Sequence, residues 1–226
     1  MKMTDYFIFD LDGTLLDSLG DLAASTNHAL RSCGMPEHSI DDIRRFVGNG
    51  VRTLMVRAVP GGDENPRFEE AFSAFREHYM EHCFDTTKPY EGIPETLSRL
   101  KERGVRMAIV SNKMQEATEH LRQRFFSDYI NVAIGESRKI KRKPAPDAVV
   151  EALRLLGCND RDRAVYIGDS DVDIETARAS GLRCISVLWG FRNRRFLLDH
   201  GADCLIDTPA ELIPFCSMNT GISQNR

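Results

Sequence analysis

The sequence predicts an α/β fold, in which a doubly wound, Rossmann-like parallel sheet forms the core and an all-helical segment is inserted into it. Two observations carry this prediction. Short, nearly continuous apolar runs alternate with amphipathic segments, which is typical of strands buried on both faces of a parallel sheet and of the helices between them. From about residue 17 to residue 88, in contrast, helical periodicity continues without a strand pattern.

The expected strands are short runs of aliphatic and aromatic residues. In chain order they cover residues 6–11, 105–110, 130–134, 164–167, 184–188 and 204–206. The helices expected between and after them cover residues 94–103, 114–126, 146–156 and 173–180. Gly104, Gly157 and Gly181 follow three of these helices, where glycine commonly ends a helix. Thr208 and Glu211 match a capping box that starts one more helix.

The inserted segment has the periodicity of amphipathic helices. Residues 21–33 place Leu22, Thr26, Ala29, Leu30 and Cys33 on one side, and residues 41–47 and 51–59 form shorter helical patterns. Aromatic residues and a cysteine then recur at helical spacing at Phe68, Phe72, Phe75, Tyr79 and Cys83. This second set is expected to pack inside the segment. The predicted domains are therefore a core of residues 1–16 and 88–226 and a helical domain of residues 17–87, with a loop at residues 60–66.

Composition excludes several classes of protein. The 226 residues are 42% hydrophobic and 28% charged, with a net charge of −4, which fits a globular protein and gives no general surface for nucleic acid. We expect no membrane span, because no apolar stretch approaches about 20 residues. The six cysteines show no zinc-ligand spacing, and no signal peptide precedes them. A cytoplasmic protein with free thiols is the expectation, and residues 217–226 are expected to fray.

Two aspartates close the first expected strand. Asp10 and Asp12 stand at positions i and i+2, followed by Gly13 and Thr14. Ligands of parallel sheets bind outside the carboxyl ends of the strands, where both carboxylates can converge after a tight glycine exit. Thr14 offers a hydroxyl and an amide to an anion. A plain turn with solvated aspartates is the alternative.

The segment Asp10-Leu-Asp-Gly-Thr-Leu15 resembles the first motif of the haloacid dehalogenase-like hydrolase superfamily. Three further motifs follow in the order that this resemblance implies. Ser111-Asn112 follows the second strand, Lys143 opens Lys-Pro-Ala-Pro-Asp147, and Gly168-Asp-Ser-Asp-Val-Asp173 follows the strand at residues 164–167. Together the four motifs span nearly the whole chain.

The resemblance implies phosphoryl transfer by the two aspartates. Asp10 is expected to attack phosphorus and to form an aspartyl-phosphate. Asp12 is expected to protonate the leaving oxygen and later to accept a proton from water. Mg²⁺ is the implied cofactor, because a hard cation offsets the repulsion between two anions. Its implied ligands are the Asp10 carboxylate, the Asp12 carbonyl and Asp169.

Other polar residues are expected to hold the phosphoryl group. The resemblance implies that Ser111 and Asn112 donate hydrogen bonds to it and that Lys143 sets a positive charge beside Asp10. Lys139, Lys141 and Arg142 stand in the same basic run and are expected to be solvated. A surface position is the stronger expectation for Lys113, and a substrate-facing position is the alternative.

The last motif contains three aspartates. On a helix entry, residues i and i+4 share a face, so Asp169 and Asp173 are the expected pair. Asp173 is expected to orient the ligands from outside or to bind through water. Asp171, between them, points away and is expected to be a helix cap or a solvated residue.

The position and sequence of the insertion resemble the phosphoglycolate phosphatase-like branch, in which a helical cap follows the first motif. Residues 46–50, 111–113, 142–147 and 189–191 are similar to segments of that branch. The resemblance implies a hinge at residues 16–18 and a cap that shields the site. An ordinary helix-breaking turn is the alternative for the glycines of residues 48–50.

The expected function is Mg²⁺-dependent hydrolysis of a small phosphate ester, with phosphoglycolate as the first expectation. A phosphomutase is the main alternative, for which Arg44, Arg45 and Arg52 are the only candidates to grip a second phosphate. Inorganic pyrophosphatase activity is a further alternative. A non-catalytic scaffold and a dehalogenase are disfavoured, because every catalytic residue type, Asp12 and Asp169 included, is present. The expected assembly is a monomer or homodimer.

Overall fold

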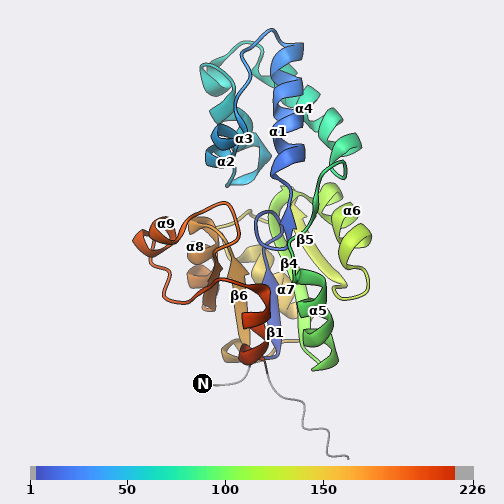
Figure 1. The fold of residues 1–226 in the computed structure, drawn as a ribbon, viewed down its shortest axis with the longest axis vertical. Coiled ribbons are helices and arrows are strands. Elements are labelled where there is room, and N and C mark those ends of the chain that lie inside the picture. The colour runs from blue at the N-terminus through green and yellow to red at the C-terminus, as the bar shows by residue number, and fades with distance from the viewer. Residues whose placement is uncertain (1–3, 217–226) are drawn as a thin grey trace, which may run out of the picture.

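The computed structural model describes residues 4–216, and its centre is a six-stranded parallel sheet (Figure 1). The strands are β1 (Tyr6–Phe9), β4 (Arg106–Met114), β5 (Val132–Glu136), β6 (Ala164–Gly168), β7 (Arg183–Val187) and β8 (Leu205–Ile206). Their order is β5-β4-β1-β6-β7-β8. The chain therefore winds outward from β1 on one side and then returns to its other side. This is a doubly wound sheet, as the sequence predicts, and its switch point lies at β1.

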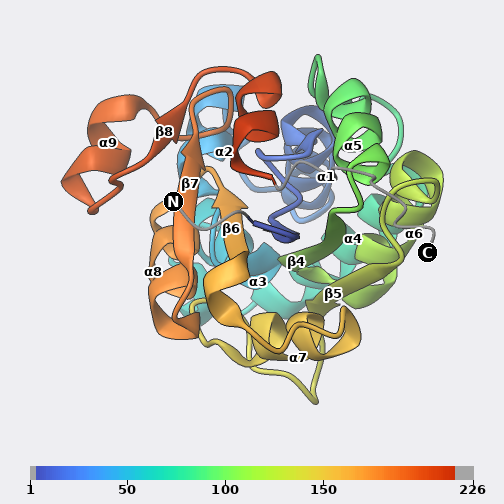
Figure 2. The ribbon, with the colours of Figure 1, turned by 90° about the horizontal axis from the view of Figure 1, so that it is seen from below.

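The central strand is apolar because each of its faces is covered. Phe7 and Phe9 pack into one hydrophobic cluster with helices α5 (Ile93–Glu102) and α6 (Gln115–Phe126). Ile8, between them, points to the opposite cluster, formed with α7 (Asp147–Leu155) and α8 (Asp171–Ser180). Figure 2 shows these helices on the two sides of the sheet. All three β1 side chains are fully buried, so the strand is held from both faces.

The helical insertion lies beyond the carboxyl ends of the strands (Figure 1). Its helices are α1 (Leu19–Ser32), α2 (Ile40–Phe46), α3 (Gly50–Ala58) and α4 (Phe68–His82). They enclose a hydrophobic cluster of their own, in which Phe68, Phe75 and Tyr79 are buried, as the aromatic spacing predicts. Two short strands, β2 (Leu16–Asp17) and β3 (Lys88–Pro89), pair antiparallel where the chain enters and leaves the insertion. The predicted domain boundaries, after residue 16 and before residue 88, fall within this two-stranded ribbon.

The carboxylate of Asp21, at the start of the insertion, ties these connections together. Its two oxygens accept hydrogen bonds from the backbone N–H and the hydroxyl of both Thr86 and Thr87, at 2.6 to 2.9 Å. Asp21 is buried, so all four donors compensate the desolvation of its charge. The first turn of α1 is therefore fastened to the residues that lead into β3, at the base of the insertion.

Several expected elements differ in detail from the structure. The capping box of Thr208 and Glu211 is present, but the helix after it, η3 (Pro209–Phe215), is a 3₁₀ helix that contains Pro214. Helix α9 (Arg194–Asp199) was not predicted, since six residues carry little periodicity. Two short 3₁₀ helices, η1 (Gly62–Glu64) and η2 (Arg161–Arg163), complete the elements. The expected fraying of residues 217–226 lies outside the described residues.

Within residues 4–216, no helix has the length and apolar character needed to cross a membrane.

Candidate active site

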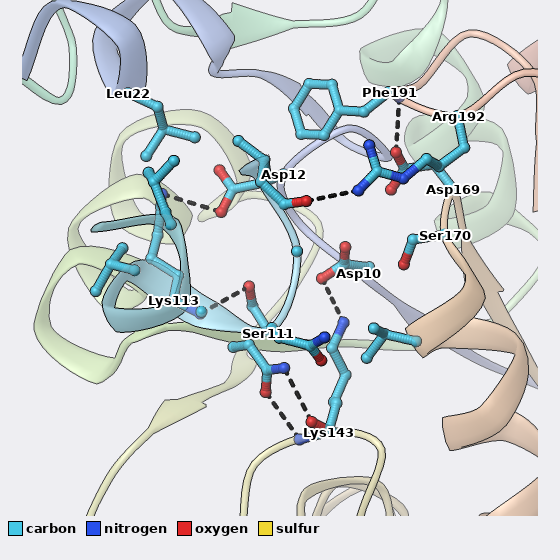
Figure 3. A pocket seen from close by; sticks show the side chains of 18 residues that line it. Asp10, Asp12, Leu22, Ser111, Lys113, Lys143, Asp169, Ser170, Phe191 and Arg192 are labelled. Carbon is cyan, nitrogen blue, oxygen red and sulfur yellow. Dashed lines mark hydrogen bonds and ion pairs between the residues drawn. The ribbon is translucent and has the colours of Figure 1, made fainter. Parts of the chain in front are cut away.

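The site forms where three neighbouring strands end. Asp10 directly follows β1, Ser111 lies in the last part of β4, and Asp169 directly follows β6. Because β4 and β6 flank β1 in the sheet, these side chains meet at the switch point of the doubly wound fold. Figure 3 shows them around one pocket. The four motifs, separated by up to about 160 residues in the chain, thus converge on Asp10.

Lys143 connects two of the buried carboxylates. Its ammonium donates to Asp10 Oδ1 at 2.7 Å, to Asp173 Oδ1 at 2.8 Å and to the Tyr166 hydroxyl at 3.0 Å. A lysine has three N–H donors, so this set uses all of them. Burial by itself lowers the pKa of Lys143, but the Asp10 and Asp173 carboxylates raise it well above its ordinary value. Lys143 is therefore a fixed positive charge beside Asp10.

Asn112 holds the Lys143 backbone. Its side-chain oxygen accepts from the Lys143 N–H at 2.8 Å, and its amide donates to the Lys143 carbonyl at 3.0 Å. The amide is thus engaged with the chain, whereas the sequence reasoning expects it to bind a phosphoryl group. Ser111 Oγ accepts from the Lys113 N–H at 3.2 Å, and its hydroxyl proton has no acceptor within the described residues. Both side chains line the pocket.

Asp169 reaches the site because two glycines give it space. A Cβ atom on Gly13 would lie 2.4 Å from Asp169 Oδ2, and one on Gly190 would lie 2.3 Å from Asp169 Cβ. Gly13 also has φ +87°, a conformation that favours glycine. Asp169 Oδ2 accepts from the Phe191 N–H at 2.7 Å, and Oδ1 accepts from the Thr14 hydroxyl at 3.4 Å. Thr14 thus contacts Asp169 within the protein.

Asp173 is occupied by hydrogen bonds from the protein. Oδ1 accepts from Lys143 and from Tyr166, while Oδ2 accepts from the backbone of Asp169 and from both the backbone and the hydroxyl of Ser170. Five donors leave these oxygens little capacity for another partner. We therefore interpret Asp173 as the residue that orients Lys143 and the loop of Asp169, although its oxygens lie close enough to those of Asp10 and Asp169 to share a cation. Ser170, not Asp171, is the N-cap of α8.

The buried charges around Asp10 do not balance. The carboxylates of Asp10, Asp169 and Asp173 are buried together, and within the described residues Lys143 is the only cation that forms an ion pair with any of them. Burial raises the pKa of Asp10 to about 7, and the charges of Asp173 and Asp12 act in the same direction against Lys143. Burial, followed by the charges of Asp173 and Asp10, raises the pKa of Asp169 well above its ordinary value. When ionised, the group carries an excess of two negative charges.

This donor set fits a divalent cation with a preference for oxygen. Ligand oxygens of Asp10, Asp169 and Asp173 lie within 4.8 Å of one another, and all three residues are buried. Mg²⁺ prefers carboxylate, carbonyl and water oxygens. Asp10 Oδ2 accepts no hydrogen bond from the described residues, so Asp10 keeps one oxygen that no protein donor occupies. The residues therefore fit the cofactor that the sequence reasoning expects.

Asp12 lies in a second polar group. Ser18 donates to Asp12 Oδ1 at 2.5 Å, and the ammonium of Lys113 lies 3.0 Å from Asp12 Oδ2. Lys113 also donates to the hydroxyl of Tyr79, at 2.5 Å. Burial by itself lowers the pKa of Lys113, but the Asp12 carboxylate and the Tyr79 hydroxyl raise it above its ordinary value. The preferred expectation of a surface position for Lys113 is wrong, because the residue is only 3% exposed.

The pocket is closed on one side by the insertion. It has a volume of about 60 Å³, room for several water molecules at about 10–15 Å³ each and so for a small polar group. Residues from the insertion and the core line it together: Asp10, Asp12, Leu22, Val47, Gly48, Asn49, Gly50, Val51, Leu54, Ser111, Asn112, Lys113, Lys143, Asp169, Ser170, Val172, Phe191 and Arg192. A substrate here would contact both parts of the chain.

Arg192 fastens the insertion over this pocket. Its guanidinium donates to the carbonyls of Arg44 at 2.9 Å and Val47 at 2.6 Å, near the end of α2. The neighbouring Phe191 N–H binds Asp169, so one short loop contacts both the insertion and a candidate metal ligand. Gly50 also lies close to the core, since a Cβ atom on Gly50 would be 3.1 Å from the Asn112 carbonyl oxygen. The turn at residues 48–50 thus contacts the site.

Sequence reasoning missed Ser18, Tyr79 and Arg192. The helical spacing of Tyr79 predicts that its ring packs inside the insertion, and the ring does so. The spacing gives no indication that its hydroxyl contacts Lys113 at the site. Ser18 is the last residue of the expected hinge but was given no role at the site, and Arg192 follows the aromatic-glycine-aromatic turn at residues 189–191. A search for polar residues directly after each motif could have found these two.

A family model for haloacid dehalogenase-like hydrolases matches residues 7–187 of the chain. The chain belongs to this family. A phosphoglycolate phosphatase of Aquifex aeolicus is 35% identical over 185 residues, 81% of this chain and 84% of that protein. An N-acetylmuramic acid 6-phosphate phosphatase of Pseudomonas aeruginosa is 32% identical over 91% of this chain and 92% of that protein. The fold, the family and these relatives identify the protein as a phosphatase.

A solved structure shows the same fold at similar sequence identity. A protein from Lactobacillus delbrueckii subsp. bulgaricus, provisionally assigned as a phosphoglycolate phosphatase, superposes with a TM-score of 0.88. It is 35% identical, and the match covers 93% of this chain and 97% of that one. The similarity spans the core and the insertion together.

Proposed function

We propose that the protein is a Mg²⁺-dependent phosphate monoesterase that acts on a small phosphorylated acid through an aspartyl-phosphate. The observation that carries this proposal is that the two aspartates of one pocket, Asp10 and Asp12, have different hydrogen-bonding partners. Asp10 is held by Lys143 through one oxygen, and its other oxygen accepts no hydrogen bond within residues 4–216, whereas Asp12 is held by Ser18 and Lys113. One carboxylate is therefore placed to attack and the other to exchange protons.

The proposed reaction has two steps. Asp10 Oδ2 attacks phosphorus, the bond from phosphorus to the ester oxygen breaks, and Asp12 gives that oxygen its proton. Water then attacks the aspartyl-phosphate, Asp12 accepts the proton from this water, and phosphate leaves with Asp10 restored. Lys143 holds Asp10 Oδ1 throughout, so that Oδ2 stays directed to the substrate. The Ser111 hydroxyl is available as a donor to a phosphoryl oxygen.

A Mg²⁺ ion would be held by Asp10, Asp169 and the Asp12 carbonyl, and when bound it supplies positive charge that offsets repulsion between carboxylate and phosphate. The excess of two negative charges among Asp10, Asp169, Asp173 and Lys143 supports a divalent ion. Thr14 and Phe191 keep Asp169 oriented from the protein side.

Removing a metal ligand gives the first prediction. Mg²⁺ at about 100 times its dissociation constant should stabilise the wild-type protein by about 2.7 kcal/mol, seen as a rise in Tm. The variant Asp169→Asn should lose most of this rise, because it removes one of the charges that attract the ion. The control Asp171→Asn removes a nearby carboxylate outside the ligand set and should keep the rise. An unchanged Mg²⁺ response in Asp169→Asn would contradict the metal role.

Asp12 gives the second prediction. The variant Asp12→Ala should lower kcat by about 10²–10⁴-fold on an alkyl phosphate but much less on p-nitrophenyl phosphate, because an activated leaving group needs little protonation. Steady-state kinetics on the two esters measures the difference. Equal losses on both esters would exclude Asp12 as the general acid.

The relatives support an acid as substrate. The curated names of two of them, phosphoglycolate phosphatase and N-acetylmuramic acid 6-phosphate phosphatase, both denote phosphate esters of acids. A pocket of about 60 Å³ favours the smaller ester, so phosphoglycolate is the proposed substrate. A panel of phosphorylated metabolites ranked by kcat/KM tests this, and a sugar phosphate at the top of the ranking would contradict it.

The mutase alternative receives less support from the insertion. Of the three candidate arginines, Arg44 has only a weak partner in Asp41, at 3.9 Å, whereas Arg45 forms an ion pair with Asp42. Arg52 pairs with Glu69 and lies over the ring of Phe68. A mutase needs such arginines free to bind a second phosphate, so hydrolysis remains the proposal. All six cysteines are free thiols, which agrees with the proposed cytoplasmic location.

A further inference from the structure

Lys113 is a buried cation whose hydrogen bonding the protein leaves incomplete. Its side chain is 1% exposed, and its ammonium contacts Asp12 Oδ2 at 3.0 Å and the Tyr79 hydroxyl at 2.5 Å. Among residues 4–216 it has no third hydrogen-bonding partner, whereas Lys143 in the same pocket has all three. An ammonium has three donors, and a donor left unpaired in a buried site costs free energy.

The position of Lys113 places it on the side of the leaving group. It follows Ser111 by two residues at the end of β4, and both side chains line the pocket. It touches Asp12, the proposed proton donor to the ester oxygen, and it lines the pocket. A substituent of that oxygen would therefore lie beside the Lys113 ammonium, while the phosphoryl group lies beside Asp10.

We propose that Lys113 binds a carboxylate on the carbon next to the phosphorylated oxygen, so that the substrate class is the phosphate esters of 2-hydroxy acids. This inference rests on the proposed function and names the residue that selects within it. In such esters the carboxylate oxygens lie roughly 3 to 4 Å from the ester oxygen, from ordinary bond lengths. An ammonium one hydrogen bond from Asp12 can reach that position. Tyr79, from the insertion, holds the ammonium in place.

A second candidate for an anion is a groove of about 610 Å³ beside the pocket, lined by Arg44, Arg45, Arg57 and Arg192 among others. Three of these guanidiniums already have close partners. Arg45 pairs with Asp42, Arg57 donates to the Phe46 carbonyl, and Arg192 donates to two carbonyls of the insertion. Arg44 has a weaker partner, Asp41 at 3.9 Å. Asp10 and Asp12 do not line the groove.

The test compares two esters that differ only in charge, 2-phosphoglycolate and its carboxamide, 2-phosphoglycolamide. With Mg²⁺, the wild-type protein should show a kcat/KM about 10- to 100-fold higher for the acid, the range expected for one charge-assisted hydrogen bond. In Lys113→Met this ratio should fall to about one, mainly through a higher KM for the acid. Lys113→Arg, which keeps the charge, should restore part of the ratio.

Two control variants locate the effect. Lys139→Met removes an exposed lysine, and Arg44→Met removes the least engaged arginine of the groove. Both should keep the wild-type ratio, and Tm measured for every variant shows that each is folded. A ratio that falls in Arg44→Met but not in Lys113→Met overturns the proposal in favour of the groove.

The remaining outcomes also decide the matter. Equal loss on both esters in Lys113→Met overturns the proposal, because Lys113 would then act only through Asp12. A wild-type ratio near one overturns it without any variant, even if Lys113→Met does not fold. If the wild type hydrolyses neither these esters nor p-nitrophenyl phosphate, the proposed phosphatase function itself fails, which is a distinct result.

Discussion

Asp10→Asn should reduce turnover of p-nitrophenyl phosphate by at least about 10⁴-fold, because the amide cannot serve as the nucleophile that forms the acyl phosphate. The fold should survive. Asp10 is one of three clustered buried carboxylates, two of which, Asp10 and Asp173, share Lys143, and burial raises the pKa of Asp10 to about 7. Neutralising it removes repulsion in the Mg²⁺-free protein, so Tm without Mg²⁺ should equal or exceed that of the wild type.

Two measurements make this test strict. Mass spectrometry must show that the asparagine has not deamidated, since traces of the wild-type aspartate would mimic residual activity. Rapid quenching of the wild type with phosphorylated substrate should trap a protein heavier by one phosphoryl group, and Asp10→Asn should not. Turnover close to the wild-type rate in an intact Asp10→Asn protein would exclude Asp10 as the nucleophile.

Lys143→Met is the second change with a large expected effect, and it should damage both stability and activity. Asp10 and Asp173 would lose the cation that lies 2.7 and 2.8 Å from them. Breaking a buried ion pair by removing one partner costs about 3–5 kcal/mol in the free energy of unfolding. Activity should fall by about 10²–10³-fold, since a preorganised charge beside the transferred group is lost.

The controls for Lys143→Met come from the same stretch of chain. Lys141→Met removes an exposed lysine two residues away and should behave as the wild type in both stability and kcat. The double variant Lys143→Met with Asp173→Asn removes one uncompensated charge and should recover part of the lost Tm without recovering activity. If Lys143→Met and Lys141→Met lose equally little activity, the buried position of Lys143 has no catalytic role.

Much of the fold was predictable because local chemistry and tertiary structure agree there. The central strand is apolar at consecutive positions, since Phe7 and Ile8 face opposite clusters that are both covered by helices. The six parallel strands follow from such runs, whereas the structure supplied their order, which is one of the orders common in doubly wound sheets. Helix α9 could not be predicted, because its six residues are too few to show a period of 3.6 residues.

Some site residues were likewise predictable from the sequence, and others were not. Asp10, Asp12 and Asp169 could be identified because each stands in a short motif at the end of an apolar strand, and the fold brings those ends together. Lys113 could not be placed, because a lysine next to a motif is usually solvated. Only the packing of α4 onto the core puts Tyr79 beside it and buries the ammonium.

By itself, the sequence determined the family, the α/β core and the polar residues that gather at the carboxyl ends of its strands. These features depend on short-range patterns, because neighbouring residues determine whether a strand is buried and which turn follows it. The tertiary structure alone decided how those residues share their hydrogen bonds. The Asn112 side chain bonds the backbone of Lys143, and five donors bond the Asp173 carboxylate. Within residues 4–216, one donor of Lys113 has no partner. These hydrogen bonds depend on the distances between segments that are far apart in the chain. Side-chain packing sets those distances.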